Sequence, residues 1–458
     1  MKLKYIAAGS AVLSLFVLGL VFQQFYSSSL TNANHDINVE GWILPYVDQQ
    51  IFIKWRGDIR SSDILSTFSD IEAASVESDF MVADLSLVTL RTRMSIKEAL
   101  LKLRRNPNIE YAEPNYYQYA FAGFFPPAKS KKPALNPAPG EPNGEADPLF
   151  GQTWGVKTVR APQVWPTWMG SHDVIVGIID TGIDYNHEDL AYNLWRNEKE
   201  IPDNKVDDDN NGYVDDLVGW DFVANEPLPY DDNRHGSHVS GTIGAVGENG
   251  KGTIGVSPRI LLMGVKFLDN KGSGKTNNAI KAIEYAAFNG ARVLNNSWGG
   301  GSYSKALEDT IIETRKMGVL FVAAAGNSGN NIDSQPSYPA SYKIDNIIAV
   351  AATDQNDKLA SWSNYGKQSV HLAAPGVDTL STTPNNDYQL LSGTSMATPH
   401  VVGAAALVWS AVPDLTYDQL KRILIESVRK VPSLNESVVS SGVLDVENAF
   451  RHATGTGN

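Results

Sequence analysis

The chain has no cysteine among its 458 residues, which excludes disulfide bonds and thiolate metal sites. It is also short of positive charge, because 38 Lys and Arg stand against 51 Asp and Glu and leave a formal net charge of −13. Residues 1–146 are nearly balanced, so the acidic excess lies in residues 147–458. A surface this acidic argues against nucleic acid as a partner and is compatible with bound cations.

The N-terminus holds an apolar run without any charge. Lys2 and Lys4 precede 18 uncharged residues, from Tyr5 to Phe22. Basic residues ahead of such a run are typical of an export signal, although its length is close to a membrane span and no A-x-A cleavage site follows. We therefore predict that residues 1–29 are a cleaved signal peptide and that the protein is secreted. The alternative is an uncleaved membrane anchor, with the rest of the chain outside.

Residues 45–120 have the pattern of a small α+β unit. Stretches such as "QIFIKW" and "MVADLSLVTLRT" are typical of strands. The stretch "SIKEALLKLRRN" is typical of an amphipathic helix, and its Ser95 and Glu98 have capping-box spacing. With an earlier helix near "SSDILSTFSDIEAA" and a last strand in "IEYAEPNYYQYA", the order is β-α-β-β-α-β. That order predicts a ferredoxin-like unit.

The composition then changes twice. Residues 121–146 are dense in Pro, Gly, Lys and Asn, which predicts a flexible, protease-accessible linker. In residues 147–458, short continuous apolar runs such as "VIVGIID" and "VLFVAAAGN" alternate with helical stretches. This alternation predicts an α/β fold with a doubly wound parallel sheet covered on both faces. In such sheets the active groups lie at the carboxyl ends of the strands.

Three polar residues stand at the ends of predicted elements. Asp180 ends the strand "VIVGIID", His235 opens the helix "HGSHVSGTIGA", and Ser395 lies in "SGTSMATPH" at the start of another helix. Taken singly, they fit a turn cap, a structural histidine and an N-cap serine. Taken together, they supply a nucleophile, a base and an orienting acid, which serine chemistry requires.

The motifs "DTGID", "HGSHVSGTIGA" and "GTSMATPHVVGAAAL", in the order Asp, His, Ser, resemble those of the subtilisin-like serine proteases. The resemblance covers about residues 150–450, and "NIEYAEPNY" resembles the inhibitory prosegment of that family. It implies a serine endopeptidase that hydrolyses peptide bonds. Asp180 would orient His235, His235 would take the proton of Ser395, and the Ser395 oxygen would attack the scissile carbonyl, as in the well-known triad.

The resemblance also implies further site residues. Asn327 in "VAAAGNSG" matches the family's "AAGN" and would stabilise the oxyanion beside the Ser395 backbone N–H, whereas its simple alternative is turn chemistry. One side of the cleft would be formed by "NNSWGG" and the other by "DNKGSGKT", for which a plain glycine-rich loop is an equal alternative. A peptide paired on both sides would be an added strand with broad specificity. The predicted cleft residues are Ser297, Trp298, Gly299, Gly272, Ser273 and Gly274.

An acidic segment, "VDDDNNGYVDDLVGWDF", precedes the histidine motif. Its spacing fits positions 1, 3, 5 and 6 of an EF-hand-like calcium loop, with a backbone carbonyl at position 7. Position 12 is Val218, so the usual bidentate carboxylate is missing, and Asp215 or Asp216 is the available substitute. A solvated acidic turn is the alternative, but structural calcium is common in the subtilisin-like family. We predict calcium bound by Asp207, Asp209, Asn211, Tyr213 and Asp215.

These features together predict an exported serine endopeptidase made as a zymogen. Its parts would be residues 1–29, a prosegment over 45–120, a linker over 121–146 and a catalytic domain over 147–458. By family analogy it would cleave itself between Tyr119 and Asp147. Its partners would be protein and peptide substrates and its own prosegment, with a membrane only if the N-terminal segment is retained. The alternatives are a pseudoenzyme that binds peptides without cutting them and a membrane-tethered processing protease with few substrates.

Overall fold

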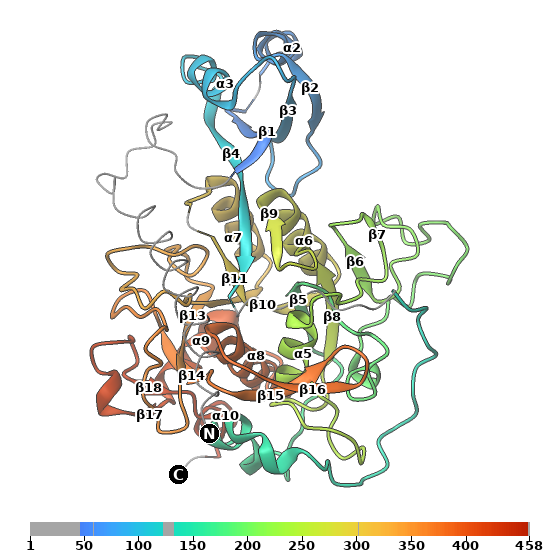
Figure 1. Cartoon of the computed structure of the whole chain (residues 1–458), viewed down its shortest axis with the longest axis vertical. Coiled ribbons are helices and arrows are strands. Elements are labelled where there is room, and N and C mark those ends of the chain that lie inside the picture. Colours follow the sequence, from blue (N-terminus) through green and yellow to red (C-terminus); the bar gives the residue numbers. More distant parts are fainter. Residues whose placement is uncertain (1–45, 58, 122–131, 301, 457–458) are drawn as a thin grey trace, which may run out of the picture. The chain divides into compact units, whose positions relative to one another are not determined.

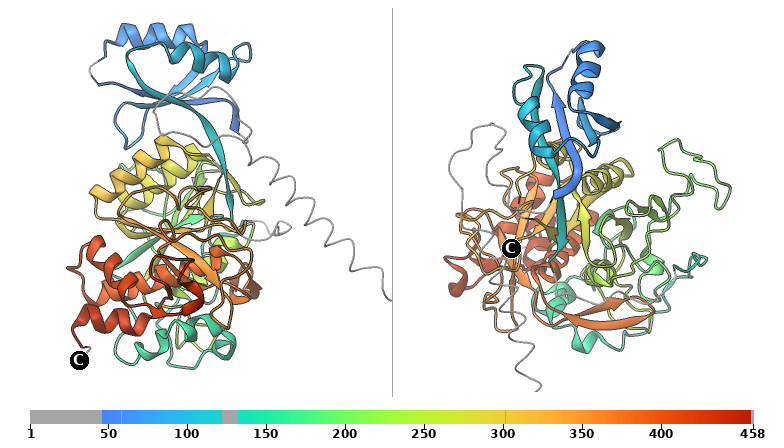
Figure 2. Two further views of the ribbon diagram at one scale, coloured as in Figure 1. Left: turned by 90° about the vertical axis from the view of Figure 1, so that its left-hand side faces the viewer. Right: turned by 45° about the horizontal axis from the view of Figure 1, so that its top comes forward.

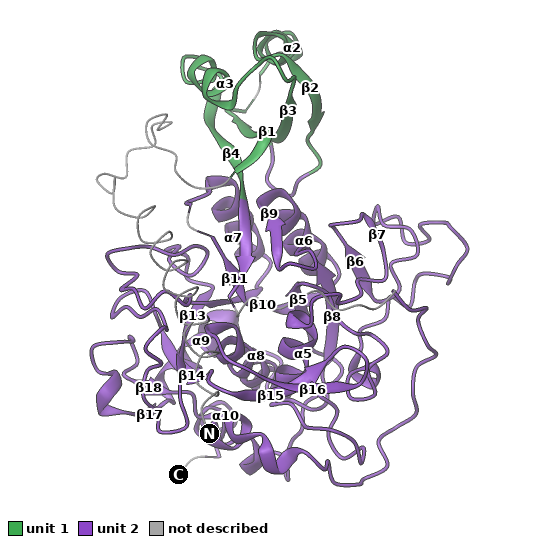
Figure 3. Ribbon diagram, in the orientation of Figure 1, with its two compact units in different colours: residues 1–79, 84–116 green, residues 80–83, 117–458 purple. Residues whose placement is uncertain are grey.

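The computed structural model describes residues 46–57, 59–121, 132–300 and 302–456. The predicted signal segment, residues 1–29, lies outside these ranges. The chain divides into two compact units, one from residues 1–79 and 84–116 and the other from 80–83 and 117–458 (Figure 3). Within the described ranges, no helix has both the length and the apolar character needed to cross a bilayer.

The first unit has the predicted β-α-β-β-α-β order. Its sheet runs β4-β1-β3-β2, with antiparallel pairs throughout. Ser95 and Glu98 cap α3 reciprocally, and the apolar faces of strands and helices share one core that includes Ile51, Val88 and Leu100. The elements are β1 (Tyr46–Trp55), α2 (Ser61–Asp70), β2 (Ala73–Glu77), β3 (Leu85–Leu90), α3 (Ile96–Leu103) and β4 (Ile109–Ala120), whose residues from Tyr117 on belong to the second unit.

A ten-stranded sheet runs through the second unit in the order β17-β18-β14-β13-β12-β10-β5-β8-β6-β7 (Figure 1). Its neighbours pair in parallel except at the two edges, β17–β18 and β6–β7. The strands are β5 (Ile175–Asp180), β6 (Gly219–Asp221), β7 (Glu226–Pro227), β8 (Leu261–Lys266), β10 (Ala291–Asn296), β12 (Leu320–Ala324), β13 (Ile347–Thr353), β14 (Leu372–Pro375), β17 (Arg429–Lys430) and β18 (Gly442–Val443).

Helices cover both faces of this sheet (Figure 2). Val176 and Ile178 of β5 share a core cluster with α8, whereas Gly177 between them faces Ala286 of α6. The predicted doubly wound parallel architecture is therefore confirmed. The helices are α4 (Trp154–Thr158), α5 (His235–Gly244), α6 (Thr276–Phe288), α7 (Lys305–Lys316), α8 (Thr394–Ala411), α9 (Tyr417–Glu426) and α10 (Val446–Thr454). Short strands β9 (Ser273–Lys275) and β11 (Trp298–Gly299) and a hairpin of β15 (Thr379–Thr383) and β16 (Asp387–Leu391) lie outside the large sheet.

The order of the strands reverses beside β5. From β5 the chain builds β6, β7 and β8 on one side, and α6 then leads to β10 on the other side. In open parallel sheets, ligands bind beyond the carboxyl ends of the strands at such a switch point. The fold therefore predicts a functional site at the carboxyl ends of β5 and β10.

The described part of the predicted linker, residues 132–146, differs from the expected flexible segment. The side chains of Tyr185 and Asn186 donate hydrogen bonds to the carbonyl oxygens of Pro133 and Ala134, and Gly144 N–H donates to the Glu248 carbonyl. Side-chain donors from the second unit thus satisfy a proline-rich backbone that cannot pair regularly with itself. These residues are fixed along the second unit.

Candidate active site

Asp180 and His235 come together at the carboxyl end of β5. The Asp180 side chain is fully buried, and its Oδ1 lies 2.7 Å from Nδ1 of His235, the first residue of α5. A carboxylate only accepts hydrogen bonds, so the imidazole donates from Nδ1 and keeps a lone pair on Nε2. Within the described part of the chain, that Nε2 has no hydrogen-bond partner. The pair therefore presents a basic nitrogen ready to take a proton.

A second buried carboxylate fixes the start of α5. Asp231 Oδ2 accepts from Ser237 N–H at 2.7 Å, and its Oδ1 accepts from the Thr181 hydroxyl at 2.8 Å. That hydroxyl in turn accepts from Gly236 N–H at 2.9 Å. Since Thr181 follows Asp180 directly, these bonds tie the first turn of α5 to the strand end that carries the acid. Burial raises the pKa of Asp231, and the backbone donors at Arg234 and Ser237 oppose that effect.

Glycine at position 236 lets the helix approach the strand this closely. A Cβ there would lie 2.0 Å from the carbonyl oxygen of Gly182, a distance at which no side chain fits. The glycine of the "HGSH" motif is thus explained by packing next to the acid–base pair.

Ser395 is the second residue of α8, and it lies beside the neighbouring strand end. Its hydroxyl donates to the Ser297 carbonyl oxygen at 2.8 Å rather than to His235. The register of β10 on β5 pairs Asn295 with Ile178, so Ser297, one residue past the end of β10, and Asp180, the last residue of β5, lie at the carboxyl ends of neighbouring strands. Adjacent strands are about 4.8 Å apart, so the serine and the histidine are anchored at neighbouring strand ends. The Ser395 hydroxyl must reorient before it can donate to the imidazole, a change that often accompanies substrate binding.

The residues after Tyr116 form an extended strand in the predicted cleft. Residues 117–119 pair antiparallel with β9, and Tyr119 and Ala120 pair antiparallel with β11. Ala120 N–H donates to the Gly272 carbonyl at 2.9 Å, and Phe121 N–H donates to the Ser297 carbonyl at 3.1 Å. The structure thus places all six predicted cleft residues along this strand: Ser297, Trp298, Gly299, Gly272, Ser273 and Gly274.

Asn327 points its donor at the last carbonyl of that strand. Its Nδ2 donates to the Phe121 carbonyl oxygen at 2.6 Å. Its Oδ1 accepts from both the N–H and the hydroxyl of Thr394, at 2.9 and 2.8 Å, which fixes the orientation of the amide. The preceding Gly326 has φ 107°, a left-handed value that favours glycine. Thr394 was not among the predicted residues, and its position next to Ser395 was the only signal for it.

The Phe121 ring lies against the backbone of Gly299. A Cβ at that glycine would lie 2.4 Å from the Phe121 Cζ atom. Because Gly299 has no side chain, there is room for the aromatic ring of Phe121.

The predicted metal ligands are brought together in part. Asp207 and Asp209 can gather their carboxylate oxygens with that of Glu200, which lies outside the motif and was not predicted. Glu200 also accepts from the N–H groups of Asp208 and Asp215, so it organises the loop around it. Asp215, a predicted ligand, is not a member of this group, and its Oδ2 accepts from Lys205 N–H. The Asn211 side-chain oxygen accepts from the N–H of Tyr213, the predicted carbonyl ligand.

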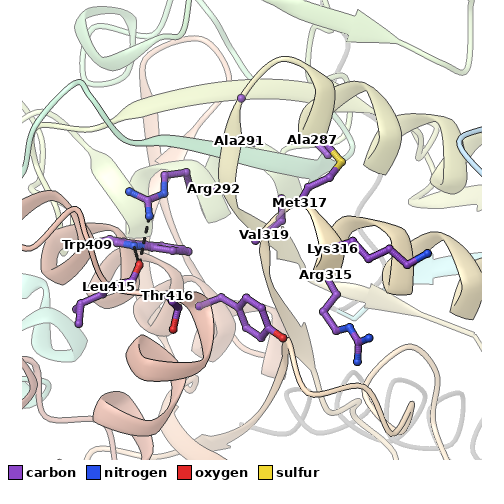
Figure 4. Close-up of a pocket in the computed structure, with 13 residues that line it drawn as sticks. Ala287, Ala291, Arg292, Arg315, Lys316, Met317, Val319, Trp409, Leu415 and Thr416 are labelled. Atoms are coloured by element: carbon purple, nitrogen blue, oxygen red, sulfur yellow. Dashed lines mark hydrogen bonds between the residues drawn. The ribbon is translucent and has the colours of Figure 1, made fainter.

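A separate hollow of about 380 Å³ shares no residue with the site described above (Figure 4). The Arg292 guanidinium lies 3.9 Å from the centre of the Trp409 ring and donates to the carbonyl oxygen of Pro413. Arg292 therefore joins the start of β10 to the turn after α8 and has a structural explanation. The hollow is lined by Ala287, Gly290, Ala291, Arg292, Arg315, Lys316, Met317, Gly318, Val319, Trp409, Leu415, Thr416 and Tyr417.

Comparisons with known proteins match two parts of the chain to described families. Residues 171–451 match the model of the subtilase family, and residues 32–115 match that of the fervidolysin N-terminal prodomain. A thermophilic serine proteinase of Bacillus sp. (strain AK1) is 33% identical over 414 residues, which are 90% of each chain. Thermitase of Thermoactinomyces vulgaris is 41% identical over 265 residues, or 58% of this chain and 85% of thermitase. Subtilisin-like protease 1 of Plasmodium vivax is 41% identical over 294 residues, or 60% of this chain. The chain spans about half the length of such Plasmodium relatives.

Proposed function

Because the chain belongs to the subtilase family, we propose that it is a serine endopeptidase that works through Asp180, His235 and Ser395 and cuts itself after Phe121. One observation carries the proposal. The strand that ends at Phe121 is paired on both sides of the cleft, and its last carbonyl oxygen accepts from Asn327 Nδ2 at 2.6 Å. A peptide carbonyl held by such a donor next to the serine is in the position of a substrate.

The chemistry follows from these positions. The Ser395 oxygen attacks the Phe121 carbonyl carbon while its proton passes to His235 Nε2, and Asp180 stabilises the imidazolium. The Phe121 oxygen becomes an oxyanion that Asn327 Nδ2 stabilises. The imidazolium then gives its proton to the nitrogen of residue 122, and the peptide bond breaks. Water next attacks the acyl group on Ser395 with His235 again as the base, which frees the Phe121 carboxylate.

Removing Ser395 tests self-processing directly. When the whole chain is expressed in a protease-deficient host, N-terminal sequencing of the wild type should find a fragment that begins at residue 122. Ser395→Ala should remain joined through that bond, and Ser392→Ala, which removes a serine of the same motif, should be cut like the wild type. Cutting of Ser395→Ala at the same bond, or no cutting of the wild type, would overturn the proposal. A peptide-binding pseudoenzyme predicts the second outcome.

Export and a prosegment fit this activity. The N-terminal run after Lys2 and Lys4 would direct the chain out of the cell, and a self-cleaved prosegment would delay activity until after folding. Sequencing the mature protein and fractionating the cells would distinguish secretion from membrane attachment. Recovery of activity only in the membrane fraction would favour the anchored processing protease.

Calcium is the second part of the proposal. Three carboxylates that can bring their oxygens within 4.8 Å of one another, from Glu200, Asp207 and Asp209, offer the hard oxygen ligands that calcium prefers. Bound calcium would neutralise their repulsion and hold the loop to Glu200.

This site predicts calcium-dependent stability. In the Ser395→Ala background, excess calcium over a chelator should raise Tm by several degrees, because a ligand at about 100 times its Kd adds about 2.7 kcal/mol. Asp207→Asn should reduce that increase, and Asp203→Asn, at an exposed position of the same loop, should not. If calorimetry finds the same calcium-induced rise in Tm in the Ser395→Ala parent and in its Asp207→Asn and Asp203→Asn variants, this loop is not the calcium site.

A further inference from the structure

Lys266, the last residue of β8, is a buried cation beside the acid–base pair. It is 3% exposed, and no other lysine or arginine in residues 46–57, 59–121, 132–300 and 302–456 is buried. In the parallel pairing of β8 with β5, Lys266 lies opposite Asp180. Moving a charge out of water costs free energy unless the protein supplies partners for it. The partners of this ammonium therefore indicate what the charge does there.

The ammonium of Lys266 has three N–H donors, and all three are used. Its Nζ donates to the Thr181 carbonyl at 2.7 Å, to the Leu268 carbonyl at 3.0 Å and to Asp232 Oδ1 at 2.7 Å. Thr181 N–H in turn donates to Asp180 Oδ1 at 2.7 Å, and Leu268 N–H donates to the Asp180 carbonyl at 3.2 Å. Lys266 thus fastens the two segments that hold the backbone and the carboxylate of Asp180.

The surroundings of the His235 imidazole are rich in carboxylates. Asp180 and Asp231 are fully buried, and Asp180 Oδ2 has no hydrogen-bond partner among the residues that the structure describes. Negative charge near an imidazole favours the protonated form, which cannot accept a proton. Lys266 acts in the opposite direction. Burial raises the pKa of Asp231, and the positive charge of Lys266 is one of the effects that oppose this rise.

Other charged or titratable side chains also lie on the elements around the pair. Arg234, the other cation in this group, is partly exposed, so water screens its charge more than that of the buried Lys266. Burial lowers the pKa of both histidines in the group, which keeps them neutral near pH 7. The group consists of Asp184, Asp221, Asp232, Arg234, His238 and His400.

We propose that Lys266 is a positioning residue for the acid–base pair. Its hydrogen bonds fix the backbone around Asp180, and its charge keeps His235 in the neutral form that can take the proton of Ser395. The Asp232 side chain, which is 37% exposed, offsets part of that charge. The ion pair of Lys266 and Asp232 thus sets the pH at which activity begins. This inference rests on the proposed function, because it takes His235 as the base.

Removing either charge should move the acid limb of the pH profile, in opposite directions. Without the ammonium, the carboxylates around His235 are uncompensated, so the imidazolium persists to higher pH. A unit charge on the order of 10 Å away, in surroundings between protein and water in polarity, changes the midpoint by about 0.3–1 pH unit. Without the Asp232 charge, the midpoint should move to lower pH, and by less, because this carboxylate is partly exposed.

The acid limb of kcat/KM, which reports the free enzyme, provides the test. Each enzyme is purified after expression of the whole chain and assayed at constant ionic strength on an internally quenched peptide of residues 116–123. We expect the midpoint of Lys266→Met to lie about 0.3–1 pH unit above that of the wild type. The midpoint of Asp232→Asn should lie below the wild type, and that of the double variant between Lys266→Met and the wild type. Lys358→Met, at an exposed position, is the control and should leave the midpoint unchanged.

The outcomes separate this inference from the proposed function. Unchanged midpoints in Lys266→Met and Asp232→Asn would overturn the inference and leave the proposed function standing. A double variant shifted as far as Lys266→Met would also overturn it, because the shift would then come from a displaced backbone and not from charge. If Lys266→Met does not fold, Asp232→Asn decides alone: a lower midpoint supports the inference, and an equal or higher one contradicts it. Failure of the wild type to cut the peptide would instead count against the proposed function.

Discussion

At the scale of single residues, the site depends on donors that are aimed before the reaction begins. Asn327 is held through its oxygen by two bonds from Thr394, so its nitrogen points at the Phe121 carbonyl without further ordering. A donor that is oriented in advance stabilises the developing negative charge without a reorganisation cost. Thr394 thus positions Asn327, while Asn327 itself contacts the Phe121 carbonyl, the group that we propose reacts.

Asn327→Ala should therefore lower kcat by about 10²–10³-fold and change KM little, the range known for the corresponding asparagine of subtilisin. Steady-state kinetics on the peptide of residues 116–123 measure both constants, with Asn356→Ala in an exposed turn as the control. A wild-type kcat in Asn327→Ala would remove this residue from the mechanism.

At the scale of elements, the predicted cleft is an incomplete antiparallel sheet that residues 117–121 complete. Strands β9 and β11 each present one edge, and the strand of residues 117–121 fills the space between them. Backbone pairing of this kind accepts many sequences, so under the proposed function any selectivity would come from side-chain contacts. Glycines make room for two side chains of the strand, because Phe121 lies against Gly299 at the end of β11 and Gln118 lies against Gly300, which follows.

Gly299→Ala should therefore exclude the aromatic ring. A Cβ 2.4 Å from Phe121 Cζ forces the ring out, so kcat/KM for a peptide with Phe before the cut should fall by at least about tenfold. A matched peptide with Ala in that position should lose much less. The ratio of the two rates is the measurement, and an unchanged ratio would show that the ring binds elsewhere.

At the scale of the whole molecule, buried histidines and buried carboxyls have opposite effects on how the stability of the protein changes with pH. Burial lowers the pKa of His187 and His400 to about 4 and of His238 to about 3. Burial raises the pKa of Asp189 to about 7 and of Asp216 to about 6. Histidines kept neutral make the fold less stable as the pH falls below their ordinary ~6.5, whereas the carboxyls make it less stable as the pH rises towards 7.

A single variant separates the two effects. His400 contributes stability that is fully present above pH ~6.5 and is lost as the pH falls towards about 4, where its folded form titrates. We therefore compare Ser395→Ala with the double variant that also carries His400→Asn. Between pH 7 and 4 the free energy of unfolding should fall in both, but in the double variant the fall should be smaller by on the order of 2–3 kcal/mol. Denaturant unfolding measures this, with His452→Asn at an exposed site as the control. Parallel pH profiles of wild type and His400→Asn would contradict it.

Whether an interaction can be predicted from the sequence depends on how far apart its partners lie along the chain. The fold class, the strand end at Asp180 and the helix start at His235 follow from local patterns and short motifs, and the structure has them in place. Glu200 was not predictable, because it lies seven residues before the acidic segment that begins at Asp207 and meets it only through the path of the loop. The bound course of residues 132–146 was missed for a similar reason, since its partners Tyr185 and Asn186 are distant in sequence. The Gln118–Thr276 contact joins residues 158 positions apart.

Labelling the serine tests the central claim most directly. The whole chain is treated with a peptide phosphonate that ends in phenylalanine, and the modified residue is located by mass spectrometry. We predict one phosphonylated residue, Ser395, in the wild type, and almost none in His235→Ala, because the hydroxyl is reactive only beside the imidazole. No modification of Ser395 in folded wild-type protein, or equal modification in His235→Ala, would contradict the account.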